Sequence, residues 1–379
     1  MDRRHLVLAS AMGAVVAALP KPASSASAAL APIRLGQSAP ISGPLSRVGT
    51  AYRDAALAVF AEVNDGGGIG GRRVELITLD DEDRSERTAV NAKLLVSDHG
   101  VIAFFGFVGA GAHRIGLRAA QEEGVPYIAP LSGASELQTA AGPGVFTMRA
   151  SHADEIRYIA RHTRQVGIER LSLVYEYNSQ GWDLRDTLID TLAAEGRGVA
   201  SITSVDHEGS VYTLPGAIAA IQAGNPQAVV LGADYVASAK LVGAMRDAGF
   251  GGLFYTLSTV GGRALAERLG PQATGISVTQ VVPFPWSEAS VLGRAFKRFC
   301  QRHSLERSFE AMEAWLSATL LVDALRKTRQ PTPEGVAEAL RSTPRRDMGG
   351  FFGGLGSGPR EGNAYVELTV YSRDGRFIR

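Results

Sequence analysis

The first regular pattern of apolar and polar residues along the chain is a strand, a helix and a second strand. Residues 33–38 alternate apolar and polar side chains, as a half-buried strand does, and residues 74–80 form the next strand pattern. Between them, apolar side chains recur at helical spacing on one face, at Tyr52, Ala56, Val59, Phe60 and Val63. Two strands joined through a helix predict a parallel sheet with a right-handed crossover.

The same rhythm of helices and strands continues to the C-terminus and predicts an α/β fold. Further helices are expected at residues 86–98, 112–123, 154–165, 181–194, 213–223, 237–248, 261–269, 288–303, 310–327 and 332–342. Further strands are expected at residues 102–106, 127–129, 146–149, 171–175, 199–205, 228–232, 252–256, 275–282 and 365–371. Because ligands of open α/β sheets bind outside the carboxyl ends of the strands, the loops that follow these strands are the candidate binding loops.

The N-terminal segment differs from the rest of the chain. Arg3 and Arg4 precede an uncharged run of 14 residues, Leu6 to Leu19, and the small residues 26–28 (Ala-Ser-Ala) offer a cleavage site. This layout is typical of a secretory signal peptide, and the apolar run is too short to span a bilayer. We therefore expect residues 1–28 to be a signal peptide and the mature protein to be periplasmic. The arginine pair leaves Sec and twin-arginine export both open.

Composition excludes several functional classes. The 379 residues suffice for two domains, and a net charge of +1 gives no basic excess for binding nucleic acid. Cys300 is the only cysteine, so an intrachain disulfide and CxxC sites are excluded, and no cysteine near the N-terminus is available to carry a lipid. No other run approaches about 18 apolar residues, so we expect a protein that does not span the membrane. Neither a GxSxG elbow nor a GxxxxGK[ST] loop occurs, and we expect neither an enzyme nor a cofactor.

Two other motifs have ordinary structural explanations. Residues 66–71 match GxGxxG, but they follow a helix and precede a strand, whereas dinucleotide binding needs the opposite order. We interpret them as a turn. The acidic run at residues 80–83 is interpreted as helix capping and a solvated surface, with Asp83 as the cap of the helix 86–98, rather than as a metal site.

The opening unit resembles a known family. It contains Ser-Gly-Pro at 42–44, Gly49, the amphipathic helix, Asn64 before Gly-Gly-Ile-Gly-Gly, and a strand that ends in Asp80-Asp81. This order is similar to the start of the leucine/isoleucine/valine-binding family, the type I periplasmic solute-binding proteins of ABC transporters. A looser likeness continues through Tyr371.

The resemblance implies two doubly wound, Rossmann-like lobes joined by a three-crossover hinge, the Venus-flytrap arrangement. Lobe 1 would comprise residues 33–149 plus 287–345, and lobe 2 residues 150–280 plus 363–379. The crossovers would lie near 149–152, 281–286 and 345–362. A ligand would lie between the lobes.

The resemblance also implies candidate ligand-binding residues. In amino-acid-binding relatives, a serine, a threonine and backbone N–H groups hold the ligand carboxylate, an acidic residue holds the ammonium group, and aromatic residues pack around it. The corresponding positions and their neighbours here are Val48, Ala110, Leu131, Ser132, Gly133, Gln180, Asp234, Tyr235 and Ser258. Ser258 stands where those relatives have the acid, Ala110 where they have the serine and Gly133 where they have the threonine. Asp234 brings a new charge to the second lobe. We therefore expect a ligand other than a plain branched-chain amino acid.

From the resemblance we expect the exported solute-binding component of an ABC importer. It would bind a small molecule, amino-acid-like or a related organic solute, and dock transiently on permease subunits in the inner membrane. A ligand-sensing receptor or regulator on the same fold, such as an amide sensor or a chemoreceptor partner, remains an open alternative at this point.

Overall fold

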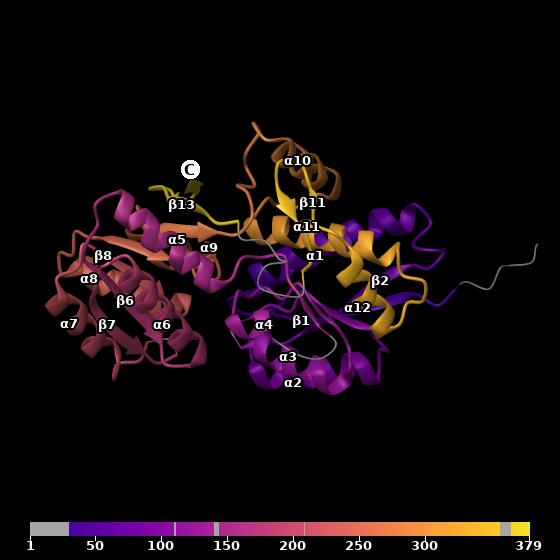
Figure 1. The fold of residues 1–379 in the computed structure, drawn as a ribbon, viewed down its shortest axis with the longest axis horizontal. Helices are drawn as coiled ribbons and strands as arrows, with labels where there is room; N and C mark the ends of the chain where they lie inside the picture. The colour runs from indigo at the N-terminus through magenta and orange to yellow at the C-terminus, as the bar shows by residue number, and fades with distance from the viewer. Residues whose placement is uncertain (1–29, 110, 140–143, 208, 357–364) are drawn as a thin grey trace, which may run out of the picture.

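Two separate sheets, each covered by helices, organise the molecule (Figure 1). The computed structural model describes residues 30–109, 111–139, 144–207, 209–356 and 365–379. The expected signal peptide, residues 1–28, lies outside the described residues. Within the described part of the chain, no helix combines the length and the apolar character needed to cross a bilayer.

The first sheet has five parallel strands in the order β2-β1-β3-β4-β5. Its strands are β1 (Ile33–Ala39), β2 (Val74–Asp80), β3 (Ala103–Phe105), β4 (Tyr127–Ile128) and β5 (Val145–Phe146). The helices that connect them are α1 (Ser46–Asp65), α2 (Ser85–Ser97), α3 (Ala112–Glu123) and α4 (Ser135–Thr139). Tyr52, Val59 and Phe60 of α1 are buried, as the helical pattern predicts.

The second sheet has seven strands in the order β14-β13-β10-β9-β8-β6-β7. Its parallel strands are β6 (Leu171–Glu176), β7 (Val199–Val205), β8 (Ala228–Gly232), β9 (Leu253–Thr256) and β10 (Ser277–Gln280). Two antiparallel strands extend one edge, β13 (Glu367–Tyr371) and β14 (Phe377–Ile378). The helices of this part are α5 (His152–Gln165), α6 (Ser179–Ala194), α7 (Leu214–Gly224), α8 (Tyr235–Asp247) and α9 (Arg263–Leu269), followed by a 3₁₀ turn, Gly270–Ala273.

Three helices that follow β10 of the second sheet in sequence pack with the first sheet instead. They are α10 (Val291–His303), α11 (Phe309–Leu325) and α12 (Pro333–Ser342), and a small hairpin of β11 (Arg346–Asp347) and β12 (Phe352–Gly353) follows them. Met312 and Leu316 of α11 belong to the same hydrophobic core as Tyr52 and Phe105. We call the first sheet with α1–α4 and α10–α12 the first lobe, and the second sheet with α5–α9 the second lobe.

The chain therefore passes between the lobes three times, after β5, after β10 and after β12. The first and third connections are joined by a bridge in which the Thr147 backbone N–H donates to the Gly356 carbonyl at 3.1 Å. Part of the third expected crossover, residues 357–362, lies outside the described residues. The lobe boundaries given in the sequence analysis stay a prediction.

The acidic run at residues 80–83 behaves differently from the sequence interpretation. Arg84, not Asp83, stands at the N-cap position of α2, and the Arg84 side chain makes no capping hydrogen bond. Asp81 is fully buried and accepts hydrogen bonds from Ser38 Oγ (2.7 Å) and Thr88 Oγ1 (3.0 Å). The capping role of Asp83 and the solvated role of Asp81 were therefore wrong predictions. Asp81 joins β1 to α2, and burial raises the pKa of its carboxyl.

Candidate functional site

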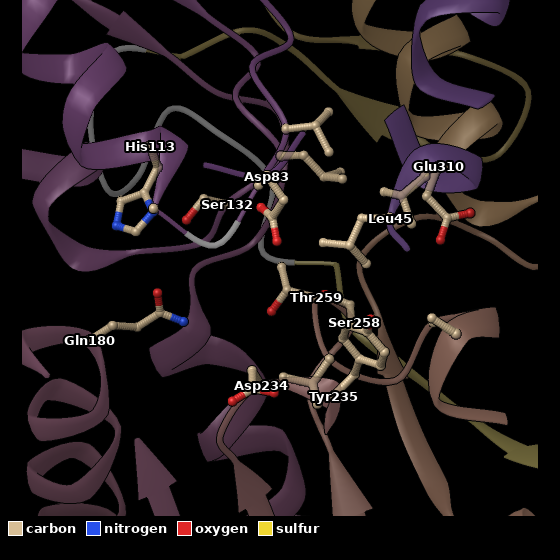
Figure 2. Close-up of a pocket in the computed structure, with 18 of the residues that line it drawn as sticks. Leu45, Asp83, His113, Ser132, Gln180, Asp234, Tyr235, Ser258, Thr259 and Glu310 are labelled. Carbon is tan, nitrogen blue, oxygen red and sulfur yellow. The ribbon is translucent and has the colours of Figure 1, made fainter. Parts of the chain in front are cut away.

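A cavity of about 590 Å³ lies between the two lobes, and residues from both line it (Figure 2). On the first lobe, a lining residue follows each of the five parallel strands in turn: Val48, Asp83, Val108, Ser132 and Arg149. Because all five strands run in one direction, the loops after them meet at one edge of the sheet. The location of this wall therefore follows from the topology.

The second lobe builds the opposite wall in the same way. Its lining residues end or follow the parallel strands β6 to β10: Glu176, His207, Asp234, Ser258 and Val281. Helix α11 adds Phe309, Glu310 and Glu313 from the first lobe. A molecule in the cavity can contact the carboxyl ends of both sheets at once.

Most of the candidate ligand residues lie together on these walls. The cavity is lined by Val48, Leu131, Ser132, Gln180, Asp234, Tyr235 and Ser258. Figure 2 shows Ser132 on the first lobe and Gln180, Asp234 and Tyr235 on the second. Gly133 is not among the lining residues, and Ala110 lies outside the described residues. That the lining residues bind a ligand stays a prediction.

Gly133 packs against His152 instead of facing the cavity. The Gly133 N–H donates to His152 Nε2 (3.2 Å), and the His152 N–H donates to the Gly133 carbonyl (2.8 Å). A Cβ atom at Gly133 would lie 2.7 Å from His152 Cδ2 and 2.8 Å from its backbone nitrogen, closer than real contacts allow. A threonine therefore does not fit at this position unless the His152 ring and the backbone of residues 150–152 move. Burial, followed by the nearby Arg149 and His113, lowers the pKa of His152 well below its usual range, which suits a ring nitrogen that accepts a hydrogen bond.

Arg149 is a buried cation on the first connection between the lobes. Its side chain is 2% exposed, and its Nη2 donates to Ser258 Oγ at 2.6 Å. Its Nε lies 3.7 Å from Oε1 of Glu313 on α11. Ser258 in turn donates its backbone N–H to Glu155 Oε2 (2.8 Å), an atom that also accepts from Thr279 Oγ1 (2.6 Å). Arg149 thus links Glu313 of the first lobe to Ser258 of the second at the wall of the cavity.

Burial shifts the protonation of the carboxylates in this network. It raises the pKa of Glu313 to about 7, although the nearby Arg149 acts in the opposite direction. It also raises the pKa of Glu155, again against the effect of Arg149. A buried carboxylate is costly unless it is paired, so these two groups hold protons at a higher pH than exposed glutamates do.

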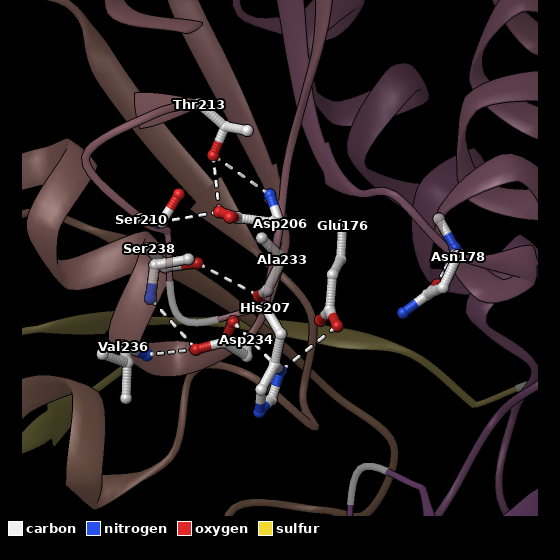
Figure 3. Close-up of polar contacts among 12 residues, drawn as sticks. Glu176, Asn178, Asp206, His207, Ser210, Thr213, Ala233, Asp234, Val236 and Ser238 are labelled. Atoms are coloured by element: carbon white, nitrogen blue, oxygen red, sulfur yellow. Dashed lines mark hydrogen bonds and ion pairs between the residues drawn. The ribbon is translucent and has the colours of Figure 1, made fainter. Parts of the chain in front are cut away.

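A second polar cluster lies on the wall of the second lobe, where Glu176, His207 and Asp234 converge (Figure 3). His207 Nδ1 lies 3.2 Å from Glu176 Oε1 and 3.8 Å from Asp234 Oδ2. The other oxygen of Asp234, Oδ1, accepts the backbone N–H groups of Val236 and Ala237 and so caps helix α8. One oxygen of Asp234 is thus structural, and the other faces the cluster.

Sequence reasoning missed several residues of the cavity, including Arg149, Glu176, His207, Glu310 and Glu313. The rule that sites lie at strand ends would have found Glu176 and His207, because both follow strands that the alternation pattern predicts. It gives no indication of Glu310 and Glu313, because these lie on a helix that reaches the cavity only through the tertiary arrangement.

Comparison with known proteins places the chain among solute-binding proteins. The sequence profile of the family described as "Periplasmic binding protein" matches residues 32–374. The leucine-, isoleucine-, valine-, threonine-, and alanine-binding protein of Pseudomonas aeruginosa is 22% identical over 337 residues, which cover 84% of this chain and 85% of that protein.

Two further similarities extend this result. The chemotactic signal transduction system substrate-binding protein BasB of Halobacterium salinarum is 24% identical over 320 residues, covering 82% of this chain and 74% of that protein. A crystal structure of a possible leucine/isoleucine/valine-binding protein from Rhodopirellula baltica superposes with a TM-score of 0.83 at 25% identity. That superposition covers 93% of this chain and 97% of the other.

Proposed function

The chain belongs to the periplasmic binding protein family, and from this premise we propose that it is the exported solute-binding component of an ABC importer. The observation that carries the proposal is the cavity of about 590 Å³, which lies at the carboxyl ends of the strands of both lobes. Such a position is typical of ligand sites in α/β proteins. The work of the protein is non-covalent: it encloses a small molecule and then presents it to a membrane permease.

We expect the two lobes to close around the solute because the solute contacts both walls of the cavity. A solute that touches both lobes gains more binding free energy when the lobes are close together, so it shifts the population toward a closed form. Three connections between the lobes provide the hinge about which they close. The residues proposed to hold the solute are those of the predicted set that line the cavity, with Ser132 on the first lobe and Gln180, Asp234 and Tyr235 on the second.

The proposal is tested by screening small metabolites against the mature chain by thermal unfolding, followed by small-angle X-ray scattering with the best stabiliser. We expect a smaller radius of gyration with the solute bound. We also expect a stabilisation of about 2.7 kcal/mol at a hundredfold excess over Kd. Deleting the gene should abolish cellular uptake of that solute. If no solute stabilises the protein, the proposal fails.

Export is part of the same proposal and rests on the pattern of residues 1–28. Sequencing the N-terminus of protein isolated from the periplasm should show that the chain starts near Ala29. Finding Met1 intact on protein that stays in the cytosol would contradict export and, with it, the importer role.

A sensing role is the second candidate, and the similarity to the chemotactic protein BasB favours it. In that case the solute-loaded protein docks on a receptor instead of a permease. The deletion strain separates the two roles: loss of chemotaxis toward the solute with unchanged uptake would support sensing, whereas loss of uptake supports import.

A further inference from the structure

The charges that line the cavity are unbalanced. Among the described lining residues, two are arginines, Arg84 and Arg149. Six lining residues carry carboxylates: Glu82, Asp83, Glu176, Asp234, Glu310 and Glu313. Arg149 is already engaged with Glu313. A cavity with this excess of negative charge attracts cations and repels anions.

The excess of negative charge in the cavity is most concentrated on the second lobe. Strands β7, β6 and β8 are neighbours in the sheet and parallel, so the residues at their carboxyl ends lie side by side. β6 ends at Glu176, His207 follows β7 by two residues, and Asp234 follows β8 by two. One ligand atom from each of the three lies within 4.8 Å of the others.

The two carboxylates of this cluster are largely shielded from solvent. The side chain of Glu176 is 19% exposed and that of Asp234 is 9% exposed, whereas His207 is 64% exposed. Burial raises the pKa of Glu176; His207 lowers it and the negative charge of Asp234 raises it. Two like charges held this close in a shielded place repel each other, and a cation between them removes that repulsion.

Resting on the proposed solute-binding function, we infer that the solute is an organic cation whose amine binds between Glu176 and Asp234, next to His207. An ammonium group offers three N–H donors and forms charge-assisted hydrogen bonds with carboxylates. Asp83 and Glu310 face the same cavity from the first lobe, so both walls attract such a molecule (Figure 2).

The cavity favours an organic cation over a bare metal ion. Donor separations of 3.2 and 3.8 Å would also suit three ligands around a divalent ion bound at about 2.1 Å. A volume of about 590 Å³ is far larger than one ion requires, and Leu45, Val48 and Tyr235 give part of the wall apolar or aromatic character. Volume and lining of this kind are typical of sites for small organic molecules.

The test uses the mature chain and a library that contains amines, zwitterions, neutral compounds and carboxylates, with ZnCl₂ and MnCl₂ tested alone. Each compound that raises Tm is then titrated by calorimetry into the wild type and into the variants Glu176→Gln and Asp234→Asn. Asn is as good a helix N-cap as Asp, so Asp234→Asn keeps α8 intact. The matched control is Asp247→Asn, which makes the same substitution at the exposed end of the same helix.

We expect every stabilising compound to carry a positive amine and to bind at least tenfold more weakly to Glu176→Gln and to Asp234→Asn than to Asp247→Asn. A stabilising neutral or anionic compound would overturn the inference but leave the solute-binding function standing. Binding of Zn²⁺ or Mn²⁺ alone, lost in both variants, would assign the cluster to a metal ion and also overturn it. Equal affinity in all variants would place the amine elsewhere. If no compound binds, the proposed function itself fails.

Discussion

Nη2 of Arg149 donates a hydrogen bond of 2.6 Å to Oγ of Ser258, and this bond joins the segment after β5 in the first lobe to the segment after β9 in the second. Both residues line the cavity, and Arg149 lies just after β5, where the first connection between the lobes begins. Ser258 was predicted as a ligand residue, and its hydroxyl oxygen already accepts this bond from Arg149. Its place in the cavity therefore has a structural reason independent of any ligand.

We predict that Ser258→Ala destabilises the protein. The substitution leaves a nitrogen of a buried guanidinium without its acceptor, which costs about 1.5–3 kcal/mol for a hydrogen bond to a charged group. Urea unfolding of the mature chain measures the change. The control is Ser204→Ala, a half-buried serine of β7 for which no side-chain hydrogen bond is found among the described residues. Equal midpoints for the two variants would show that the Arg149 contact contributes little.

Stability should fall as the pH rises, because of Glu313. Burial raises its pKa in the folded state to about 7, from an ordinary value of 4.5. Between these values the folded protein keeps a proton that the unfolded chain has released, so the stability from this group is complete below pH 4.5 and is lost as the pH passes 7. At 1.36 kcal/mol per pKa unit, the full loss is about 3 kcal/mol.

Urea unfolding of wild type and Glu313→Gln from pH 4.5 to 8 checks this expectation. Gln stays neutral, so the variant should show a flatter dependence whatever its overall stability. Glu338→Gln removes the same charge from the exposed face of α12 and serves as the control. If both variants reduce the slope of stability against pH equally, the pH dependence comes from the total charge of the protein rather than from Glu313.

Much of the fold was predictable because its elements are long and periodic. The helical pattern from Tyr52 to Val63 and the strand at 74–80 correspond to α1 and β2. The two-lobed type I fold inferred from residues 42–81 is confirmed by the family match and the superposed structure. Short elements such as α4, β11 and β14 were not predicted, because two to five residues are too few to show a period.

The site was less predictable, because side-chain partners come from distant parts of the chain. The resemblance identified Gly133 as a replaced threonine but not the reason, which is the contact with His152. It identified Asp234 as a new charge but not Glu176, whose oxygen lies near the same histidine. Asp81 was taken for a surface residue because nothing in an acidic run indicates which carboxylate turns inward.

That inward carboxylate gives a further prediction: Asp81→Ala should destabilise the protein by about 3 kcal/mol. The change removes the acceptor of the buried Ser38 hydroxyl and of the Asp83 N–H, and leaves the Thr88 hydroxyl only the Arg84 carbonyl at 3.3 Å. Each buried polar group without a partner costs about 1–3 kcal/mol. Glu82→Ala, in the next position, removes a partly exposed carboxylate at the cavity wall that pairs with Arg87, and it should cost less than about 1 kcal/mol. Thermal and urea unfolding compare the two. Similar losses of stability in the two variants would mean that the acidic residues 80–83 act through their total charge.

The last prediction concerns selectivity: leucine, isoleucine and valine should bind weakly or not at all. The Ser258 position provides no acid for the ammonium group, and Gly133 has no hydroxyl for the carboxylate. A ligand carboxylate would also face the negative charges of Asp83 and Glu310.

Calorimetry with leucine and leucinamide isolates the effect of the ligand carboxylate, because the amide keeps the ammonium group and the side chain but lacks the negative charge. Leucinamide should bind at least tenfold more tightly, a difference of about 1.4 kcal/mol. In Glu176→Gln this preference should shrink, because the ammonium group of both compounds loses the same partner, whereas only the carboxylate of leucine loses a source of repulsion. Micromolar binding of leucine would contradict the prediction, and it would mean that backbone N–H groups of the binding loops compensate for both missing side chains.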